Sequence, residues 1–259
     1  MNKVVLVDSS IFMFRSIYGW RKKKESWNPP TRQYLVSIIA NLKRLELAKE
    51  DLIILALDSH KGSWRKEIDP NYKANRKAIR KEQDDIPWQY WFDEFDKLLN
   101  IIEFATPFNI IKIDKLEADD IISEACRYYQ DKEIIIVSYD SDMEQLTAYP
   151  HVSIFSPITK KYKQIVNPYK SLAKKIDKEK TDNLVTEVVN EIDFDKRNMI
   201  INLLTLPKEV SEKVKTELEL IKVKEKYNIE MIPYPIVRER FESIWNKPIK
   251  TKSKITKLF

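Results

Sequence analysis

Six acidic side chains follow or flank short apolar runs, where buried segments rarely carry charge. They are Asp8, Asp58, Glu117, Asp119, Asp140 and Asp142. Two unit charges about 4 Å apart repel by roughly 1 kcal/mol in water and roughly 4 kcal/mol at an effective dielectric of about 20. Such a set is tolerable only if cations fill it, and oxygen ligands suit Mg²⁺ or Mn²⁺. The pattern predicts a divalent-metal site that assists phosphoryl transfer.

The apolar runs indicate how these acids would meet. Residues 4–7, 52–57, 110–113 and 134–137 are short and largely apolar, which is typical of strands covered on both faces of a parallel sheet. In such sheets the ligand crevice lies at the carboxyl ends of the strands. We therefore expect an α/β fold with a mostly parallel central sheet flanked by helices. Strands are expected at 3–7, 52–57, 109–113, 133–138 and 152–155, and helices near 10–23, 32–48, 86–101, 117–130 and 142–148.

Each acid also has a plainer interpretation when it is taken alone. An Asp after a strand commonly caps a helix or forms a turn, and acids in a first helical turn complement the helix dipole. However, Glu117, Asp119 and Asp120 place three acids within four residues, which is more than one helix end needs. Strand-end acids on four separate segments favour a common metal site over separate caps.

The charge balance favours a polyanionic partner. The chain has 259 residues, a net charge of +6, a pI of about 9.0, 43% hydrophobic residues and 33% charged residues, which is the composition of a soluble protein with a real core. Basic side chains concentrate at 61–81, where eight Lys or Arg face two acids, and a second run occupies 21–24. Basic runs are usually solvated surface. This one follows Asp58, which favours a track for phosphates.

Several classes of site and compartment are disfavoured. Only Gly19 and Gly62 are glycines, so a glycine-rich phosphate loop is excluded, and two histidines with one cysteine are too few for a structural zinc site. Cys126 has no partner for a disulfide and is expected in the core. No apolar run is long enough for a membrane span, and no secretion signal is recognised, so we expect a cytoplasmic protein. Trp88 and Trp91, at helical spacing, are expected to pack rather than stack on bases.

The motifs together resemble the flap endonuclease family of 5′ nucleases, whose fold is PIN-like, and in particular its phage RNase H members. The resemblance rests on Val7-Asp8-Ser9-Ser10, Leu57-Asp58, Trp64-Arg65-Lys66, Tyr72-Lys73-Ala74-Asn75-Arg76, Glu117-Ala118-Asp119-Asp120, Ser138-Tyr139-Asp140-Ser141-Asp142 and the segment 156–162. It covers residues 1–166 well and the rest patchily. It implies a nuclease core at 1–166, with a helical arch formed by the basic segment at about 61–91. A C-terminal helical region with a basic tail would follow at 167–259, with helices near 168–176, 182–191, 195–204, 208–226 and 235–245.

The resemblance implies a 5′-to-3′ exonuclease and flap endonuclease, acting as a monomer on RNA–DNA and DNA–DNA duplexes with 5′ ends or flaps. Removal of RNA primers during phage-type DNA replication, in the cytosol of a bacterial host, would be its task. Two Mg²⁺ ions, which Mn²⁺ can replace, are the implied cofactors. The ligands of the first ion would be Asp8, Asp58, Glu117, Asp119 and Asp140. Those of the second would be Asp142 and Asp182, supported by Glu179, which stands where the family usually has Asp.

Basic residues complete the implied site. Lys73 and Arg76 match the catalytic pair at the base of the arch; three residues apart, they would share a helix face and neutralise charge on the reacting phosphate. Tyr72 matches an aromatic residue that could stack on the terminal base. The remaining expected contacts to nucleic acid are Arg65, Lys66, Lys77, Arg80 and Lys81.

One departure from the family leaves substrate preference open. Relatives grip the downstream duplex with a helix–hairpin–helix element that has glycine turns, whereas residues 183–191 contain no glycine. Two alternatives therefore stay open: a PIN-type single-strand ribonuclease, and a catalytically inactive nucleic-acid-binding protein. PIN-type ribonucleases usually lack a segment that corresponds to 64–80. The presence of all six acidic residues argues against an inactive binding protein.

The C-terminal segment 246–259 has five lysines and no acid, and it ends in Ile255-Thr256-Lys257-Leu258-Phe259. Basic ends usually add non-specific affinity for phosphates. The terminal pattern also resembles short hydrophobic pegs that hold a sliding clamp. A clamp or a single-strand-binding protein is therefore a candidate partner.

Overall fold

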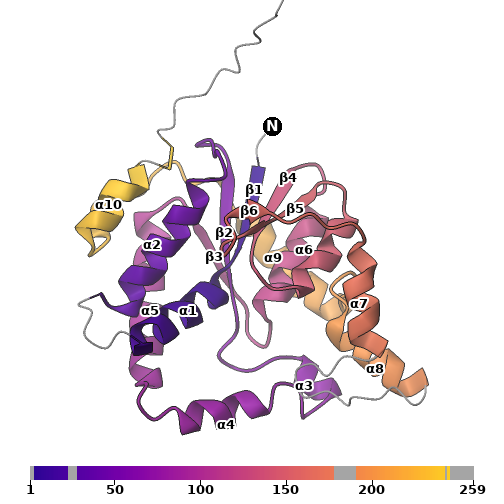
Figure 1. Cartoon of the computed structure of the whole chain (residues 1–259). Coiled ribbons are helices and arrows are strands. Elements are labelled where there is room, and N and C mark those ends of the chain that lie inside the picture. The colour runs from indigo at the N-terminus through magenta and orange to yellow at the C-terminus, as the bar shows by residue number, and fades with distance from the viewer. Residues whose placement is uncertain (1–2, 23–27, 178–190, 243, 246–259) are drawn as a thin grey trace, which may run out of the picture.

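A single mixed sheet organises the chain, shown in Figure 1 as a computed structural model that describes residues 3–22, 28–177, 191–242 and 244–245. Within these residues the sheet has six strands in the order β3-β2-β1-β4-β5-β6. Strands β1 to β5 run parallel, and β6 is antiparallel to β5 at one edge. The strands are β1 (Lys3–Asp8), β2 (Leu52–Leu57), β3 (Asn109–Lys112), β4 (Glu133–Val137), β5 (Val152–Ser156) and β6 (Lys161–Tyr162). The predicted fold class is confirmed.

The continuous apolar runs form strands because both faces of the sheet are covered. Val5 pairs with Ile53 and Ile135, and these side chains belong to one apolar cluster. Leu6 pairs with Ile54 and belongs to the cluster on the opposite face. Alternate residues of each strand therefore fill two separate cores.

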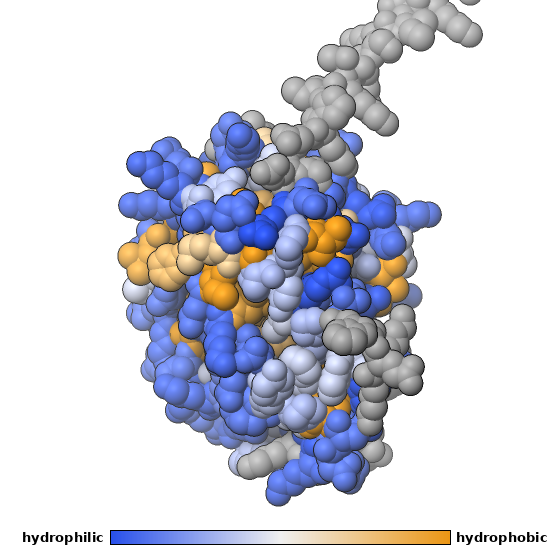
Figure 2. Space-filling view, turned by 90° about the vertical axis from the view of Figure 1, so that its left-hand side faces the viewer, coloured by the Kyte–Doolittle hydropathy of each residue, from blue (hydrophilic) through white to orange (hydrophobic). Residues whose placement is uncertain are grey.

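Two groups of helices cover the two faces of the sheet (Figure 1). The first core includes residues of α1 (Ser9–Lys22), α2 (Pro30–Leu42), α5 (Trp88–Ala105) and α10 (Pro235–Glu242). The second includes residues of α6 (Ala118–Tyr128), the 3-10 helix η1 (Asp142–Ala148) and α9 (Lys208–Leu220). Figure 2 views the molecule from the side of the first group, where hydrophobic patches interrupt a mainly hydrophilic surface. A short 3-10 helix, η2 (Ile229–Met231), lies before α10.

A smaller apolar cluster links the segment after β2 to two further helices. It joins Tyr72 to Leu172 and Ile176 of α7 (Pro168–Asp177) and to Ile200 and Ile201 of α8 (Glu191–Ile201). The start of the C-terminal region is therefore packed against the basic segment. The division predicted at residue 166 stays a prediction, and α9 and α10 share their cores with the sheet.

The basic segment forms α3 (Arg65–Ile68) and α4 (Asn75–Glu82), and α4 spans the open side of the molecule between α3 and α5 (Figure 1). No side chain of α4 that the structure describes is buried. Its far end is held by Arg21, which donates to Asp85 at 2.8 Å. The helix is therefore attached at its ends and has little packing along its length.

Some predicted boundaries are wrong. The helix predicted at 208–226 ends at Leu220, because tertiary contacts hold the next residues extended: Asn109 donates to the carbonyl of Lys222, and Lys224 donates to the carbonyls of Glu103 and Phe108. The helix predicted at 32–48 ends at Leu42, and Glu46 has a positive φ of 53°. Strand β6 was not predicted. The helix predicted at 182–191 lies almost entirely outside the described residues.

Two smaller expectations concern buried side chains. Cys126 is buried, and burial raises the pKa of its thiol. Trp91 is buried and packs edge-on against Trp20, while Trp88 packs against Phe14. Both tryptophans therefore have packing roles, as expected. Within the described residues, none of the helices has the length and apolarity to cross a membrane.

Candidate active site

The carboxyl edge of the sheet brings the predicted acids together. Asp8 ends β1, Asp58 follows β2, and Asp140 comes three residues after β4, so all three lie beyond adjacent strands. Burial and, after it, the nearby charges of Asp58 and Asp140 together raise the pKa of Asp8 to about 8. Asp119, in the first turn of α6, has its pKa raised by burial and then by Asp8 and Asp140. These carboxylates are thus close enough to repel one another.

Hydrogen bonds of ordinary length orient the acids. Ser138 donates from Oγ to Asp8 Oδ2 at 2.9 Å and accepts from the backbone N–H of Asp140 at 3.0 Å. Asp58 accepts from the backbone N–H of Ala118 at 2.9 Å. Asp58 thus also satisfies a donor at the start of α6, so capping and a place in the acidic cluster coexist.

Glu117 is held by the base of the basic segment. Tyr72 donates from its hydroxyl to Oε2 at 2.9 Å, Lys73 donates from Nζ to Oε1 at 3.0 Å, and Arg65 donates from Nη1 to Oε2 at 3.2 Å. Burial raises the pKa of Glu117, but Lys73 and Arg65 outweigh it and lower the pKa overall. Burial likewise lowers the pKa of Lys73, and Glu117 reverses the direction. Glu117 is thus an anion already matched by cations.

The arrangement of Lys73 corrects a prediction. Lys73 lies in the turn before α4 with a φ of 53°, and α4 begins at Asn75, so Lys73 and Arg76 do not share a helix face. A positive φ is uncommon for a residue other than glycine and is not compatible with a place inside the helix. Both side chains nevertheless line the same cavity.

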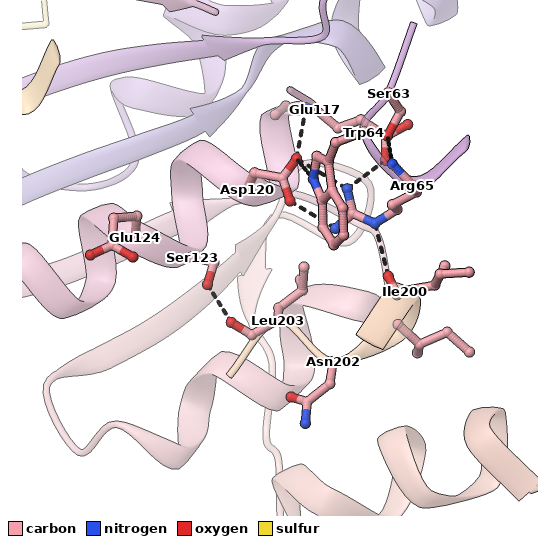
Figure 3. Close-up of polar contacts among 12 residues, drawn as sticks. Ser63, Trp64, Arg65, Glu117, Asp120, Ser123, Glu124, Ile200, Asn202 and Leu203 are labelled. Atoms are coloured by element: carbon pink, nitrogen blue, oxygen red, sulfur yellow. Dashed lines mark hydrogen bonds and ion pairs between the residues drawn. The ribbon is translucent and has the colours of Figure 1, made fainter. Parts of the chain in front are cut away.

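Arg65 and Tyr72, expected to contact nucleic acid, are buried at 2% and 4% exposure. Figure 3 shows the Arg65 guanidinium between Asp120 and the carbonyl of Ile200, to which Nε donates at 2.8 Å. Asp120 accepts from Arg65 Nη1 and Nη2 at 3.0 and 2.8 Å and from Trp64 Nε1 at 3.1 Å. The expectation for Arg65 is corrected: its buried guanidinium binds Asp120 and the Ile200 carbonyl inside the protein. The Tyr72 ring is likewise enclosed in the cluster with α7 and α8.

A cavity of about 550 Å³ lies beneath α4 and opens beside the acids. The predicted site residues that line it are Asp58, Lys66, Tyr72, Lys73, Arg76, Arg80 and Glu117. Arg80 lies over the rings of Phe14 and Phe92, at 5.6 and 5.9 Å from their centroids. Lys81 is exposed on α4, and the side chain of Lys77 lies outside the described residues. The cavity therefore has an acidic end at Asp58 and Glu117 and a basic and aromatic wall, and Asp93 and Asp96 of α5 also line it.

Asp142 lies at the start of η1, and its partner comes from the C-terminal region. Lys175 of α7 forms an ion pair with Asp142 Oδ1 and donates to Ser141 Oγ at 3.0 Å. The backbone N–H of Asp142 donates to Asp140 Oδ1 at 2.9 Å. Asp182 and Glu179, the other predicted ligands of a second ion, lie outside the described residues.

The donor chemistry fits a hard divalent cation, because the gathered ligands are carboxylate oxygens and their mutual repulsion raises pKa values. Within the described ranges no group of three Asp, Glu, His or Cys side chains already surrounds one point. An ion would therefore draw the carboxylates inward. In this structure the ammonium groups of Lys73 and Lys175 form ion pairs with Glu117 and Asp142, respectively.

Sequence reasoning named Asp120 and Ser138 within motifs but predicted no supporting role for them, and it did not single out Lys175. Asp120 carried a signal, since it stands three residues after Glu117 and its Oδ2 accepts from the Glu117 backbone N–H at 2.9 Å, as in a capping box. Ser138 was visible as a polar residue directly after an apolar run. Lys175 carried no local signal, because its partner is 33 residues away.

The chain resembles known nucleases. The family model of the 5′-3′ exonuclease N-terminal resolvase-like domain matches residues 3–183. Ribonuclease H of Enterobacteria phage T4 is 27% identical over 238 residues, which cover 85% of this chain and 77% of that protein. The 5′-3′ exonuclease of Buchnera aphidicola subsp. Schizaphis graminum is 28% identical over 147 residues, 55% of this chain and 48% of that relative. The chain thus spans most of the first relative and about half of the second.

Two solved structures share the fold. The phage T5 D15 protein, co-crystallised with metal ions, matches with a TM-score of 0.62 and 18% identity, covering 85% of this chain and 99% of that one. The T5 D15 flap endonuclease, in a complex with DNA and metal ions, matches with a TM-score of 0.57 and 19% identity, covering 94% and 98%. These likenesses confirm the fold, and the family match confirms the relationship expected from the motifs.

Proposed function

The chain belongs to the 5′-3′ exonuclease family, and from this premise we propose that it is a metal-dependent 5′ nuclease. It hydrolyses phosphodiester bonds at the 5′ ends and 5′ flaps of RNA–DNA and DNA–DNA duplexes. The observation that carries the proposal is the junction at Glu117, where the acidic sheet edge meets the basic segment through Lys73 and Tyr72. RNA primer removal in phage-type replication is the proposed role.

The acidic residues would hold two divalent ions, Mg²⁺ or Mn²⁺. The first would be held by Asp8, Asp58, Glu117, Asp119 and Asp140, and the second by Asp142 with Asp182 and Glu179. When bound, the ions supply charge neutralisation at the scissile phosphate and a water molecule more acidic than bulk water.

The chain's own residues position the strand. Arg76 and Arg80 line the cavity beneath α4 and would bind phosphates of the 5′ strand. Lys73 would neutralise charge that develops on the reacting phosphate, since its ammonium lies at the acidic end of that cavity. Lys66 and Lys81, both exposed, would add phosphate contacts.

A nuclease assay tests the proposal. Equal amounts of 5′-flap duplex, nicked duplex, RNA–DNA duplex and linear single-stranded RNA are incubated with Mg²⁺, with Mn²⁺ and with EDTA. We expect metal-dependent cleavage of the first three and abolition by Asp140→Asn. Asp114→Asn, which removes an exposed acid paired with Lys61, is the matched control and should keep full activity. Cleavage of single-stranded RNA alone would favour the PIN-type ribonuclease, and absence of any cleavage would favour an inactive binding protein.

The partners and setting are further parts of the proposal: a monomer in the cytosol of a bacterial host, with a nuclease core at 1–166 and a helical region at 167–259. The C-terminal segment 246–259 lies outside the described residues, and either an electrostatic arm or a clamp peg fits its sequence. Deleting 247–259 should weaken DNA binding and lower its salt dependence if it is an arm. Leu258→Ala with Phe259→Ala should remove only stimulation by the clamp if it is a peg. If neither the deletion nor the double substitution has any effect, both roles are excluded.

A further inference from the structure

Lys163 connects the edge of the sheet to the loop that carries Asp140. It directly follows β6 in the chain. Its Nζ donates to the carbonyls of Tyr139 and Asp140 at 3.3 and 3.2 Å and to Glu144 Oε1 at 3.0 Å. An ammonium group has three N–H donors, so these three acceptors occupy all of them. The Lys163 side chain is 18% exposed, and its contacts are therefore largely shielded from water.

The backbone at Lys163 is fixed by the sheet. Its N–H donates to the carbonyl of Ile154 in β5 at 2.8 Å, one step beyond the pair that Phe155 and Tyr162 form between β5 and β6. The rings of Phe155 and Tyr162 also pack edge-on, with their centroids 5.5 Å apart. Ile154 and Phe155 are both buried. The Lys163 side chain therefore reaches the loop from a rigid base.

The loop holds Asp140 from the other side. The backbone N–H of Asp140 donates to Ser138 Oγ at 3.0 Å, and Asp140 Oδ1 accepts from the backbone N–H of Asp142 at 2.9 Å. Lys163 reaches Asp140 at its carbonyl oxygen. The ammonium thus fixes the backbone that carries this carboxylate without occupying a carboxylate oxygen.

Two plainer roles for Lys163 fit these contacts less well. A lysine that binds phosphate would be exposed, as Lys161 of the same hairpin is, whereas the ammonium of Lys163 is taken up by the loop. A role as partner of Glu144 alone would contribute little, because partly exposed ion pairs are weak. It would also leave the bonds to the two carbonyls without a function.

We propose that Lys163 is a positioning residue for Asp140: by binding the carbonyls of Tyr139 and Asp140, it sets where the Asp140 carboxylate stands for a divalent ion. The inference rests on the proposed function, in which Asp140 is a ligand of the first ion, and adds to it a residue from outside the acidic cluster. Groups that hold a metal-ligating residue in place fix its orientation, and their loss typically weakens metal binding or activity by roughly 10–100-fold.

Lys163→Met tests this role without an activity assay. Electron paramagnetic resonance of free Mn²⁺ measures the affinity of the protein for the ion. We expect Mn²⁺ binding roughly tenfold weaker than in the wild type. In cleavage of a 5′-flap substrate at subsaturating Mn²⁺, kcat should fall while KM for DNA changes little, because Lys163 acts on Asp140 and not on DNA. A change in KM alone would make Lys163 a phosphate contact and overturn the proposal.

Lys161→Met is the matched control. It removes the same charge from the same hairpin, and its exposed side chain makes none of the three bonds, so Mn²⁺ affinity should equal that of the wild type. Glu144→Gln removes the ion pair but keeps an acceptor oxygen for Lys163, so it too should bind Mn²⁺ nearly as tightly as the wild type. Lys163→Arg, whose guanidinium can still donate to the carbonyls, should recover part of the affinity that Lys163→Met loses.

A measurement on the wild type keeps the test independent of how the variants fold. The ¹⁵N signal of the Lys163 ammonium, assigned by its absence from Lys163→Arg, should be protected from hydrogen exchange both in EDTA and at saturating Mg²⁺. Absence of that protection, unchanged Mn²⁺ affinity in Lys163→Met, or an equal loss of affinity in Lys161→Met or Glu144→Gln would overturn the proposal. If the wild type binds no Mn²⁺, the proposed function itself fails. If the wild type and Lys163→Met bind Mn²⁺ equally well, only the inference fails.

Discussion

Arg65 and Asp120 form an ion pair in which the guanidinium donates to both carboxylate oxygens and neither side chain is more than 3% exposed. The pair connects α3 to the first turn of α6, which carries Asp119 and directly follows Glu117. The base of the basic segment and the acidic edge are thus one rigid unit, because Arg65 also reaches Glu117.

Asp120→Asn should destabilise the protein strongly. It leaves the buried Arg65 charge without its main counter-ion, and breaking such a pair costs roughly 3–5 kcal/mol. Chemical denaturation monitored by circular dichroism measures the change. Asp114→Asn, whose partner Lys61 is exposed, should have a far smaller effect. Equal effects of the two substitutions would contradict the assigned role of the buried pair.

Tyr72→Phe separates two roles for Tyr72. If its ring stacks on a terminal base, Phe should retain activity and Leu should lose it. The hydrogen bond to Glu117 predicts instead that Phe already loses function, since the hydroxyl at 2.9 Å helps to hold that carboxylate. We expect a roughly tenfold fall in kcat/KM for Tyr72→Phe, about 1.4 kcal/mol, the size of one hydrogen bond to a charged group. Single-turnover cleavage of a 5′-flap substrate provides the measurement.

The stability of the metal-free protein should fall as pH rises from 5.5 to 7.5. The folded-state pKa of Asp8 is about 8, against 3.8 for the free side chain. In this window the folded state therefore holds a proton that the unfolded state has lost. Each rise of one pH unit then lowers the free energy of unfolding by about 1.4 kcal/mol. Glu117 does not contribute in this window, since its lowered pKa affects stability only near and below its ordinary value.

Asp8→Asn is the control for this pH dependence. It removes the titrating group, so the difference in unfolding free energy between the variant and the wild type should grow by about 2–3 kcal/mol over the two pH units. Urea unfolding in EDTA measures it, and the difference cancels titration of the histidines. The pKa values of Asp58 and Asp119 are also raised, and Asp8 is one cause of the shift at Asp119, so the difference reports the proton shared by this acidic group. A flat difference would show that the group holds no such proton in the folded protein across the window.

Amides of α4 should exchange hydrogen quickly in the free protein, because none of its described side chains is buried. The residues at its two ends should exchange more slowly, since Lys73 is bound to Glu117 and Asp85 to Arg21. Binding of a 5′-flap duplex to the inactive variant Asp140→Asn should protect 76–82. Mass spectrometry of the exchanged peptides measures this, with α5 as the internal reference. Strong protection of 76–82 without DNA would contradict the expectation.

Much of the fold could be predicted because the central strands consist mainly of buried apolar residues. Residues 52–57 and 134–137 are buried, and their shortness and their content of Ile, Leu and Val favour strands over helices. The gathering of Asp8, Asp58 and Asp140 followed from strand ends that share one edge.

The rest depended on contacts distant in sequence. A run of basic residues does not reveal that Arg65 is internal, because its partners Asp120 and Ile200 lie 55 and 135 residues away. Spacing alone suggested a shared helix face for Lys73 and Arg76, but the positive φ of Lys73 puts it outside the helix. The extended chain after Leu220 likewise results from tertiary hydrogen bonds and not from helix propensity.

The enclosed position of Cys126 makes this chain suited to site-specific labelling. Thiol reagents need both access and a thiolate, and burial denies Cys126 both. A cysteine introduced in place of the exposed Ile79 on α4 would therefore react alone, with the native cysteine left in place. A fluorophore attached there would report the movement of α4 against the sheet in real time, in the unaltered background of the rest of the molecule.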